Sequence, residues 1–139
     1  MSARTFRMRM QCDYQGSDNS VVRLGVEHQV EDRWEPLELG LQSPGFEIFV
    51  YAVFTCQHLY FRVNCAERGL QLESAQGSIE IGVADDWRMQ SLAVNFSGRL
   101  VAGVPAADDI DYIAARMQQC PVSCNLSPVA GATTRVELA

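Results

Sequence analysis

The chain has 139 residues, of which 47% are hydrophobic and 20% charged, a composition typical of a single folded domain spanning residues 1–139. Its net charge of −6 argues against nucleic acid or an anionic membrane surface as the main partner. All 11 basic residues are arginines, which excludes Schiff-base chemistry. The first ten residues contain no apolar signal-peptide core, so we expect a cytoplasmic protein whose five cysteines are reduced.

The first third of the chain predicts three strands. Residues 5–12 alternate between apolar and polar side chains, as in a half-buried strand. A turn cluster at 13–19 leads to a second strand at 21–26. A third strand is expected at 34–39, and Pro36 places it at an edge of the sheet.

A long helix follows, predicted to begin with Ser43 as its N-cap and Pro44 as its first residue. It should end near Arg68, with Gly69 as the residue that stops it. Residues 46–63 are apolar on nearly every side, which is typical of a buried helix. One chain of this size has difficulty covering such a helix, so we expect a second subunit to pack against it.

The remaining elements are strands at 74–84 and 89–102, an amphipathic helix at 105–119 and a last strand at 133–138. The order β-β-β-α-β-β-α-β predicts an α+β fold with helices laid against an antiparallel sheet. The cysteines and histidines do not have the spacing of a zinc site, and no metal or organic cofactor is expected.

Two cysteines stand where a thiol can do chemistry. Cys56 lies in the middle of the long helix, and Cys120 directly follows the second helix in the segment C-P-V-S. A thiol at a helix N-terminus, where it meets unpaired backbone N–H groups, is readily converted to the reactive thiolate, whereas a cysteine inside an apolar helix is more often an inert packing group. His58 points about 200° around the helix from Cys56, so a cysteine–histidine pair within the chain is not expected.

Three segments resemble the OsmC/Ohr family, the osmotically inducible C proteins and organic hydroperoxide resistance proteins. Residues 43–49 (S-P-G-F-E-I-F) look like the opening of the family's central helix. The run from Cys56 to Gly69 has the family's spacing from reactive cysteine to helix-ending glycine. Residues 112–123 (Y-I-A-A-R-M-Q-Q-C-P-V-S) look like the helix that leads into the family's C-P-x-S segment. The thiol helix is most similar to the OsmC-like segments of YcaO-type proteins.

This resemblance implies an intertwined homodimer that acts as a thiol-dependent peroxidase in oxidative stress defence. Cys56 would attack an organic hydroperoxide, Cys120 would resolve the product as a disulfide, and a dithiol reductant would reset the pair. Glu47 matches the family's helix-borne acid. The family's arginine belongs to the first hairpin, where residues 13–19 contain none, so Arg23 is the nearest candidate.

Two alternatives stay open. The chain could be a non-enzymatic OsmC-like dimer that binds a small apolar or thiol-containing ligand, or an accessory partner of another enzyme. Cys124 or Cys65 could also serve as the resolving thiol.

Overall fold

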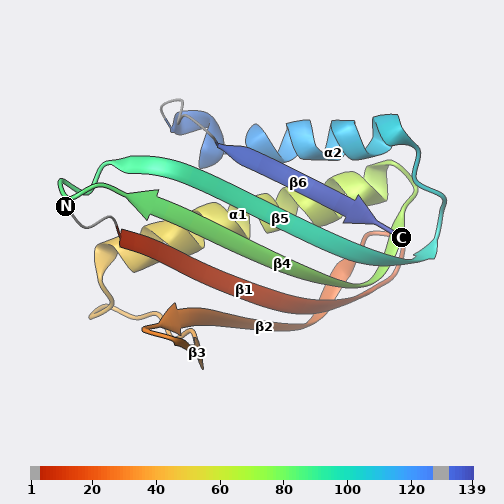
Figure 1. Ribbon diagram of the computed structural model, residues 1–139. Helices are drawn as coiled ribbons and strands as arrows, with labels where there is room; N and C mark the ends of the chain where they lie inside the picture. Colours follow the sequence, from red (N-terminus) through yellow and green to blue (C-terminus); the bar gives the residue numbers. More distant parts are fainter. Residues whose placement is uncertain (1–3, 127–131) are drawn as a thin grey trace.

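The computed structural model describes residues 4–126 and 132–139, which form a six-stranded sheet with two α-helices on one of its faces (Figure 1). Along the chain the elements are β1 (Arg4–Gln15), β2 (Ser20–Val30), β3 (Arg33–Pro36), α1 (Gly45–Glu67), β4 (Gln71–Val83), β5 (Met89–Ala102), α2 (Ala107–Gln118), the short 3₁₀ helix η1 (Ser123–Asn125) and β6 (Thr133–Leu138). The predicted α+β class and the order of its elements are confirmed.

The strand order in the sheet is β3-β2-β1-β4-β5-β6. The strand that contains Pro36 lies at one edge, as the proline predicted. The first four pairs of neighbours are antiparallel, but β5 and β6 run parallel. The expectation of a purely antiparallel sheet is therefore wrong for its last pair. The chain crosses over through α2 between these strands, and such a crossover is the connection that parallel neighbours require.

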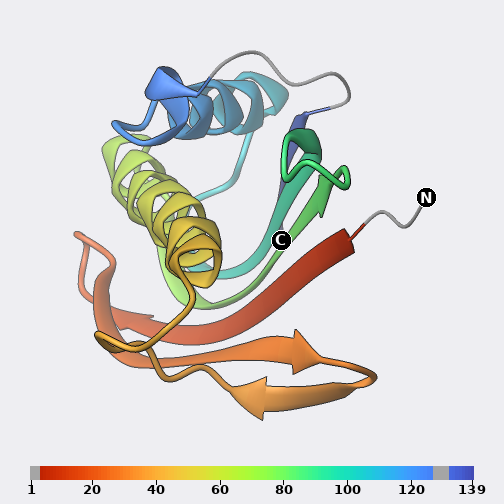
Figure 2. The same ribbon diagram turned by 90° about the vertical axis from the view of Figure 1, so that its left-hand side faces the viewer.

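The sheet curves around α1, and Figure 2 shows both helices on the same side of it. The alternation in β1 explains this arrangement: Met8, Met10 and Cys12 are buried, while Arg7 and Arg9 are exposed on the opposite face. In β4 the same period of two buries every second residue around Ile79.

The N-cap of α1 is one residue later than predicted, whereas the glycine that ends the helix is the predicted one. Pro44 occupies the N-cap position, and Ser43 instead accepts a hydrogen bond from the Gly40 N–H in the preceding turn, at 2.9 Å. Gly69 follows the helix with φ of +70°. The Leu70 N–H donates to the Cys65 carbonyl at 2.9 Å, which completes a Schellman motif.

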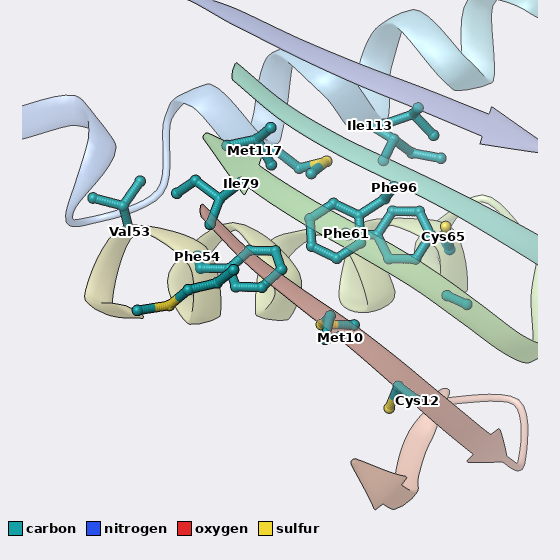
Figure 3. Packing of buried hydrophobic residues seen from close by; sticks show 14 of the residues in the cluster. Met10, Cys12, Val53, Phe54, Phe61, Cys65, Ile79, Phe96, Ile113 and Met117 are labelled. Atoms are coloured by element: carbon teal, nitrogen blue, oxygen red, sulfur yellow. The ribbon is translucent and has the colours of Figure 1, made fainter. Parts of the chain in front are cut away.

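The core lies between the sheet and the two helices (Figure 3). Phe61 and Phe96 stack with ring centroids 4.9 Å apart, which joins α1 to β5. The surrounding buried side chains come from every large element except β2: Met8, Met10, Cys12, Val50, Val53, Phe54, Cys65, Ile79, Ile81, Val94, Ile113, Met117 and Val136. Cys12 and Cys65 are packing residues of this core.

One face of α1 stays uncovered. Ile48, Leu59 and Val63 are 41%, 42% and 38% exposed, although they belong to the most apolar segment of the chain. The buried and exposed apolar faces together explain why the sequence of α1 is apolar on nearly every side. Within the described residues, no helix is long and apolar enough to span a membrane.

Candidate functional site: a thiol cluster between the helices

The two predicted cysteines meet where α1 and α2 pack together. Cys56 lies at the middle of α1, and Cys120 follows α2 by two residues. The Cys120 thiol is near enough to raise the pKa of Cys56, although 64 positions separate the two residues in the sequence. Cys120 is fully buried, Cys56 is partly buried, and neither is in a disulfide.

The turn that carries Cys120 directs two consecutive backbone N–H groups toward the two thiols. The Val122 N–H is near enough to the Cys56 sulfur to lower the pKa of that thiol. The Ser123 N–H donates to the Cys120 sulfur at 3.4 Å, while the Cys120 thiol donates to Ser123 Oγ at 3.2 Å. Pro121 has no N–H of its own, so the turn presents its donors only after the proline.

The environment of Cys56 favours its protonated form. Burial raises the pKa of the Cys56 thiol to about 11, and its side-chain hydrogen bond with Cys120 acts in the same direction. The Val122 N–H opposes this rise in pKa. The groups that set this pKa are two cysteines and a backbone amide, none of which carries a positive charge. Cys56 is therefore almost entirely a neutral thiol near pH 7.

A buried glutamine next to Cys56 holds the turn in place. Gln57 is 2% exposed, and its Nε2 donates to Ser123 Oγ at 3.1 Å. Its Oε1 accepts a hydrogen bond from Thr134 of β6, also at 3.1 Å. Gln57 thus joins α1 to η1 and β6. Gln57 was not among the residues predicted for the site, although an amide inside an apolar helix is a signal for such a network.

Glu47 does not reach the thiols within this chain. Its Oε1 lies 2.8 Å from Nδ1 of His28, which ties the first turn of α1 to β2. Glu47 precedes Cys56 by two and a half helical turns, so the two side chains leave the helix on different sides.

Arg23 is also kept apart from Cys56. In the pairing of β1 with β2, Arg23 lies opposite Asp13, and Leu24 lies opposite Cys12. Cys12 faces the core beneath α1, so the alternation of the strand turns Arg23 to the other face of the sheet. The structure therefore brings together Cys56 and Cys120, but neither Glu47 nor Arg23 with them.

His58 is buried in the core, where it contacts Tyr14 and Phe96. Its Nε2 is 2.7 Å from the Tyr14 hydroxyl, and its ring stacks on Phe96 with centroids 5.7 Å apart. Burial, followed by the charge of Arg62, lowers the pKa of His58 to about 4. The imidazole is therefore neutral at physiological pH and contributes to the core.

Cys65 faces the core near the end of α1, nine residues after Cys56 and therefore on the opposite side of the helix. Burial alone raises the pKa of its thiol to about 12. Over residues 4–126 and 132–139, no three His, Cys, Asp or Glu side chains are grouped as a metal site would require.

Comparison with known proteins identifies the fold. No protein-family model matches the sequence, and no curated protein sequence matches it. Solved structures do match over most of their length. An OsmC-like hydroperoxide resistance protein from Jannaschia sp. CCS1 aligns with a TM-score of 0.58 and 12% identity, covering 90% of this chain and 88% of that one.

Two further structures agree. An OsmC-like protein from Mycoplasma pneumoniae has a TM-score of 0.53 at 7% identity, covering 83% of this chain and 87% of its own. An OsmC-like protein of unknown function from Vibrio cholerae has a TM-score of 0.52 at 13% identity, covering 86% and 88%. The chain therefore has the OsmC-like fold, and the resemblance stated from the sequence is confirmed at the level of the fold.

Proposed function

We propose that the protein is a thiol-dependent peroxidase that reduces organic hydroperoxides with Cys56 and Cys120. The observation that carries this proposal is that the fold brings the helix of Cys56 to the turn of Cys120: Gln57, next to Cys56, donates to Ser123 Oγ at 3.1 Å, and the Cys120 thiol raises the pKa of Cys56. The fold supports it, because a similar structure is that of an OsmC-like hydroperoxide resistance protein.

The reaction has three steps. The Cys56 thiolate attacks the O–O bond of the hydroperoxide, which releases an alcohol and leaves a sulfenic acid on Cys56. The Cys120 thiolate then attacks that sulfur, and a disulfide and water are formed. A dithiol reductant finally takes up the disulfide and returns both cysteines to thiols.

The Val122 N–H has a part in this scheme, because it lies beside the sulfur that carries the negative charge. A hydrogen bond to the thiolate favours the charged form and partly offsets the cost of burial. The raised pKa of Cys56 nevertheless implies a peroxidase that works slowly near pH 7 and faster in alkaline solution.

We further propose that two chains form a homodimer through the uncovered apolar face of α1. Ile48, Leu59 and Val63 supply that face, and Cys56 lies on the same helix. Because the scheme needs reduced thiols at rest, we place the protein in the cytoplasm.

Titration with cumene hydroperoxide tests the peroxidase. Added in equal amount, the hydroperoxide should be converted to its alcohol while mass spectrometry records the loss of the Cys56 and Cys120 thiols. The Cys56→Ser variant should leave the hydroperoxide intact. If Cys56 keeps its thiol under these conditions in the wild-type protein, the peroxidase proposal is wrong.

One observation favours a second candidate, the non-enzymatic dimer that binds a small apolar or thiol-containing ligand. Glu47 is paired with His28, and Arg23 lies on the far face of the sheet, so neither assists Cys56 within the chain. In this case the titration would leave Cys56 unchanged.

A further inference from the structure

A third cysteine belongs to the thiol cluster. Cys124 follows Cys120 by one turn, within η1. Its charge raises the pKa of Cys56, so it lies near that thiol. The three thiols differ in access: Cys120 is fully buried, Cys56 is partly buried and Cys124 is exposed.

The backbone holds Cys120 and Cys124 at a separation that a disulfide can bridge. The Cys124 N–H donates to the Cys120 carbonyl at 2.9 Å, which closes one helical turn between them. In such a turn the two Cα atoms are about 6 Å apart. Disulfides join Cα atoms that lie about 4.4–6.8 Å apart.

The Cys124 side chain is turned back toward this segment. The Cys124 thiol donates a hydrogen bond to the carbonyl oxygen of Pro121, the residue next to Cys120, at 3.6 Å. Its sulfur accepts one from Asn125 Nδ2 at 3.7 Å. An exposed thiol held over the residue beside a buried thiol is well placed to exchange with it.

We propose that Cys124 is an exchange thiol that carries the oxidising equivalents from the buried cysteine pair to the surface. This inference rests on the proposed function, because it begins from the disulfide between Cys56 and Cys120. The Cys124 thiolate attacks the Cys120 sulfur, the bond from Cys120 to Cys56 breaks, and Cys56 leaves as a thiolate. Cys56 takes up the proton that Cys124 lost. One S–S bond forms as one breaks, so the exchange needs no oxidant or reductant.

The new disulfide between Cys120 and Cys124 has one sulfur at the surface. A protein dithiol attacks the Cys124 sulfur and displaces the Cys120 thiolate. The second thiol of the reductant then releases Cys124, so that the reductant leaves as a disulfide and the chain regains both thiols. The exposed position of Cys124 explains how a large reductant serves a site whose Cys120 is buried.

The arrangement of arginines makes the test direct. Trypsin leaves Cys56 alone in peptide 34–62 and places Cys120 with Cys124 in peptide 117–135. A Cys56–Cys120 disulfide joins the two peptides, whereas a Cys120–Cys124 disulfide leaves them separate and makes the second lighter by two hydrogen atoms.

We expect the full-length wild-type protein, given one equivalent of cumene hydroperoxide and then alkylated, to show the joined peptides first. These should convert to the internal disulfide of peptide 117–135 as the Cys56 thiol returns. In Cys124→Ser the joined peptides should persist, and turnover with a thioredoxin-type protein dithiol should fall by about tenfold or more. The control Cys65→Ala, which removes a core thiol outside the cluster, should behave as wild type.

Persistence of the joined peptides in the wild type, or wild-type turnover of Cys124→Ser with the protein dithiol, would overturn the inference and leave the peroxidase proposal standing. Oxidation by diamide tests the exchange thiol independently of any peroxidase activity. If cumene hydroperoxide oxidises no cysteine but diamide yields the internal Cys120–Cys124 disulfide, the exchange pair is supported and the peroxidase fails. If diamide yields only joined peptides, the exchange thiol is refuted.

Discussion

The surroundings of Cys56 determine the pKa of its thiol. Partial burial of Cys56 raises the energy of its charged form, the neighbouring Cys120 thiol acts in the same direction, and a single backbone N–H works against this effect. The reactivity of the residue therefore depends on proton loss more than on access.

The first prediction concerns the pH dependence of this thiol. With a pKa of about 11, roughly one Cys56 in ten thousand is a thiolate at pH 7. Its alkylation by iodoacetamide, followed on peptide 34–62, should accelerate about tenfold per pH unit from pH 7 to 10. Free glutathione provides the control, and its rate should level off near pH 9. A Cys56 rate already at its plateau at pH 7 would show that another group stabilises the thiolate.

The second prediction concerns His58 and stability in acid. The unfolded state takes up a proton near the ordinary pKa of 6.5, whereas the folded state resists protonation until about pH 4. Because the unfolded state binds more protons between these values, the stability contributed by neutral His58 is present above pH 6.5 and is lost as the pH falls toward 4. The difference corresponds to about 3 kcal/mol.

Urea unfolding from pH 7 to 4 measures this loss. The His58→Gln variant cannot titrate at this position, so its free energy of unfolding should fall by about 3 kcal/mol less than that of the wild type over the same range. Parallel pH profiles of the two proteins would refute the assignment.

At the scale of elements, α1 organises the molecule through three different surfaces. One packs on the sheet through Phe54 and Phe61, and another is left exposed around Leu59. Between them, Cys56 and Gln57 meet the segment that follows α2. The site therefore depends on how α1 is held against η1 and β6.

The third prediction tests the role of Gln57 in holding these elements. Gln57→Met keeps most of the side-chain volume but removes the hydrogen bonds to Ser123 and Thr134, so the free energy of unfolding should fall by about 1–3 kcal/mol in urea. Thr134→Val removes one of these bonds and should cost about 1 kcal/mol. The double variant should lose less than the sum of the two, because they share a bond. Additive losses would mean that Gln57 and Thr134 are not coupled.

At the scale of the whole molecule, the described residues leave one face of α1 open to solvent. The sheet encloses the inner face of α1, as Figure 2 shows, while Ile48, Leu59 and Val63 remain in contact with solvent. Their spacing places the three side chains on one face of the helix, and an exposed apolar face is typical of an association surface.

The fourth prediction follows from this surface. Leu59→Glu would place a charge in the proposed dimer interface, so it should raise the dimer dissociation constant by about a hundredfold or more, measured by sedimentation velocity. Leu41→Glu is the matched control, because Leu41 is fully exposed outside the helices and should leave the dimer intact. If both variants sediment like the wild type, this face of α1 is not the interface.

The sequence by itself determined the elements and their order, because local patterns carry that information. The alternation of β1, the glycine after α1 and the apolar stripe of α2 depend on neighbours a few residues away. The motifs at Cys56 and Cys120 also indicated the fold, since they combine a local pattern with a defined separation along the chain.

Only the tertiary structure decided the composition of the site. Glu47 and Arg23 were assigned from their places in the sequence, but strand register turns Arg23 away and a contact with His28 engages Glu47. Gln57 and Val122 were brought to the thiols by the packing of α1 against the segment after α2. Such contacts depend on the relative positions of elements far apart in sequence, and no local pattern encodes them. The raised pKa of Cys56 depends on the same packing, because burial is the main cause of the rise.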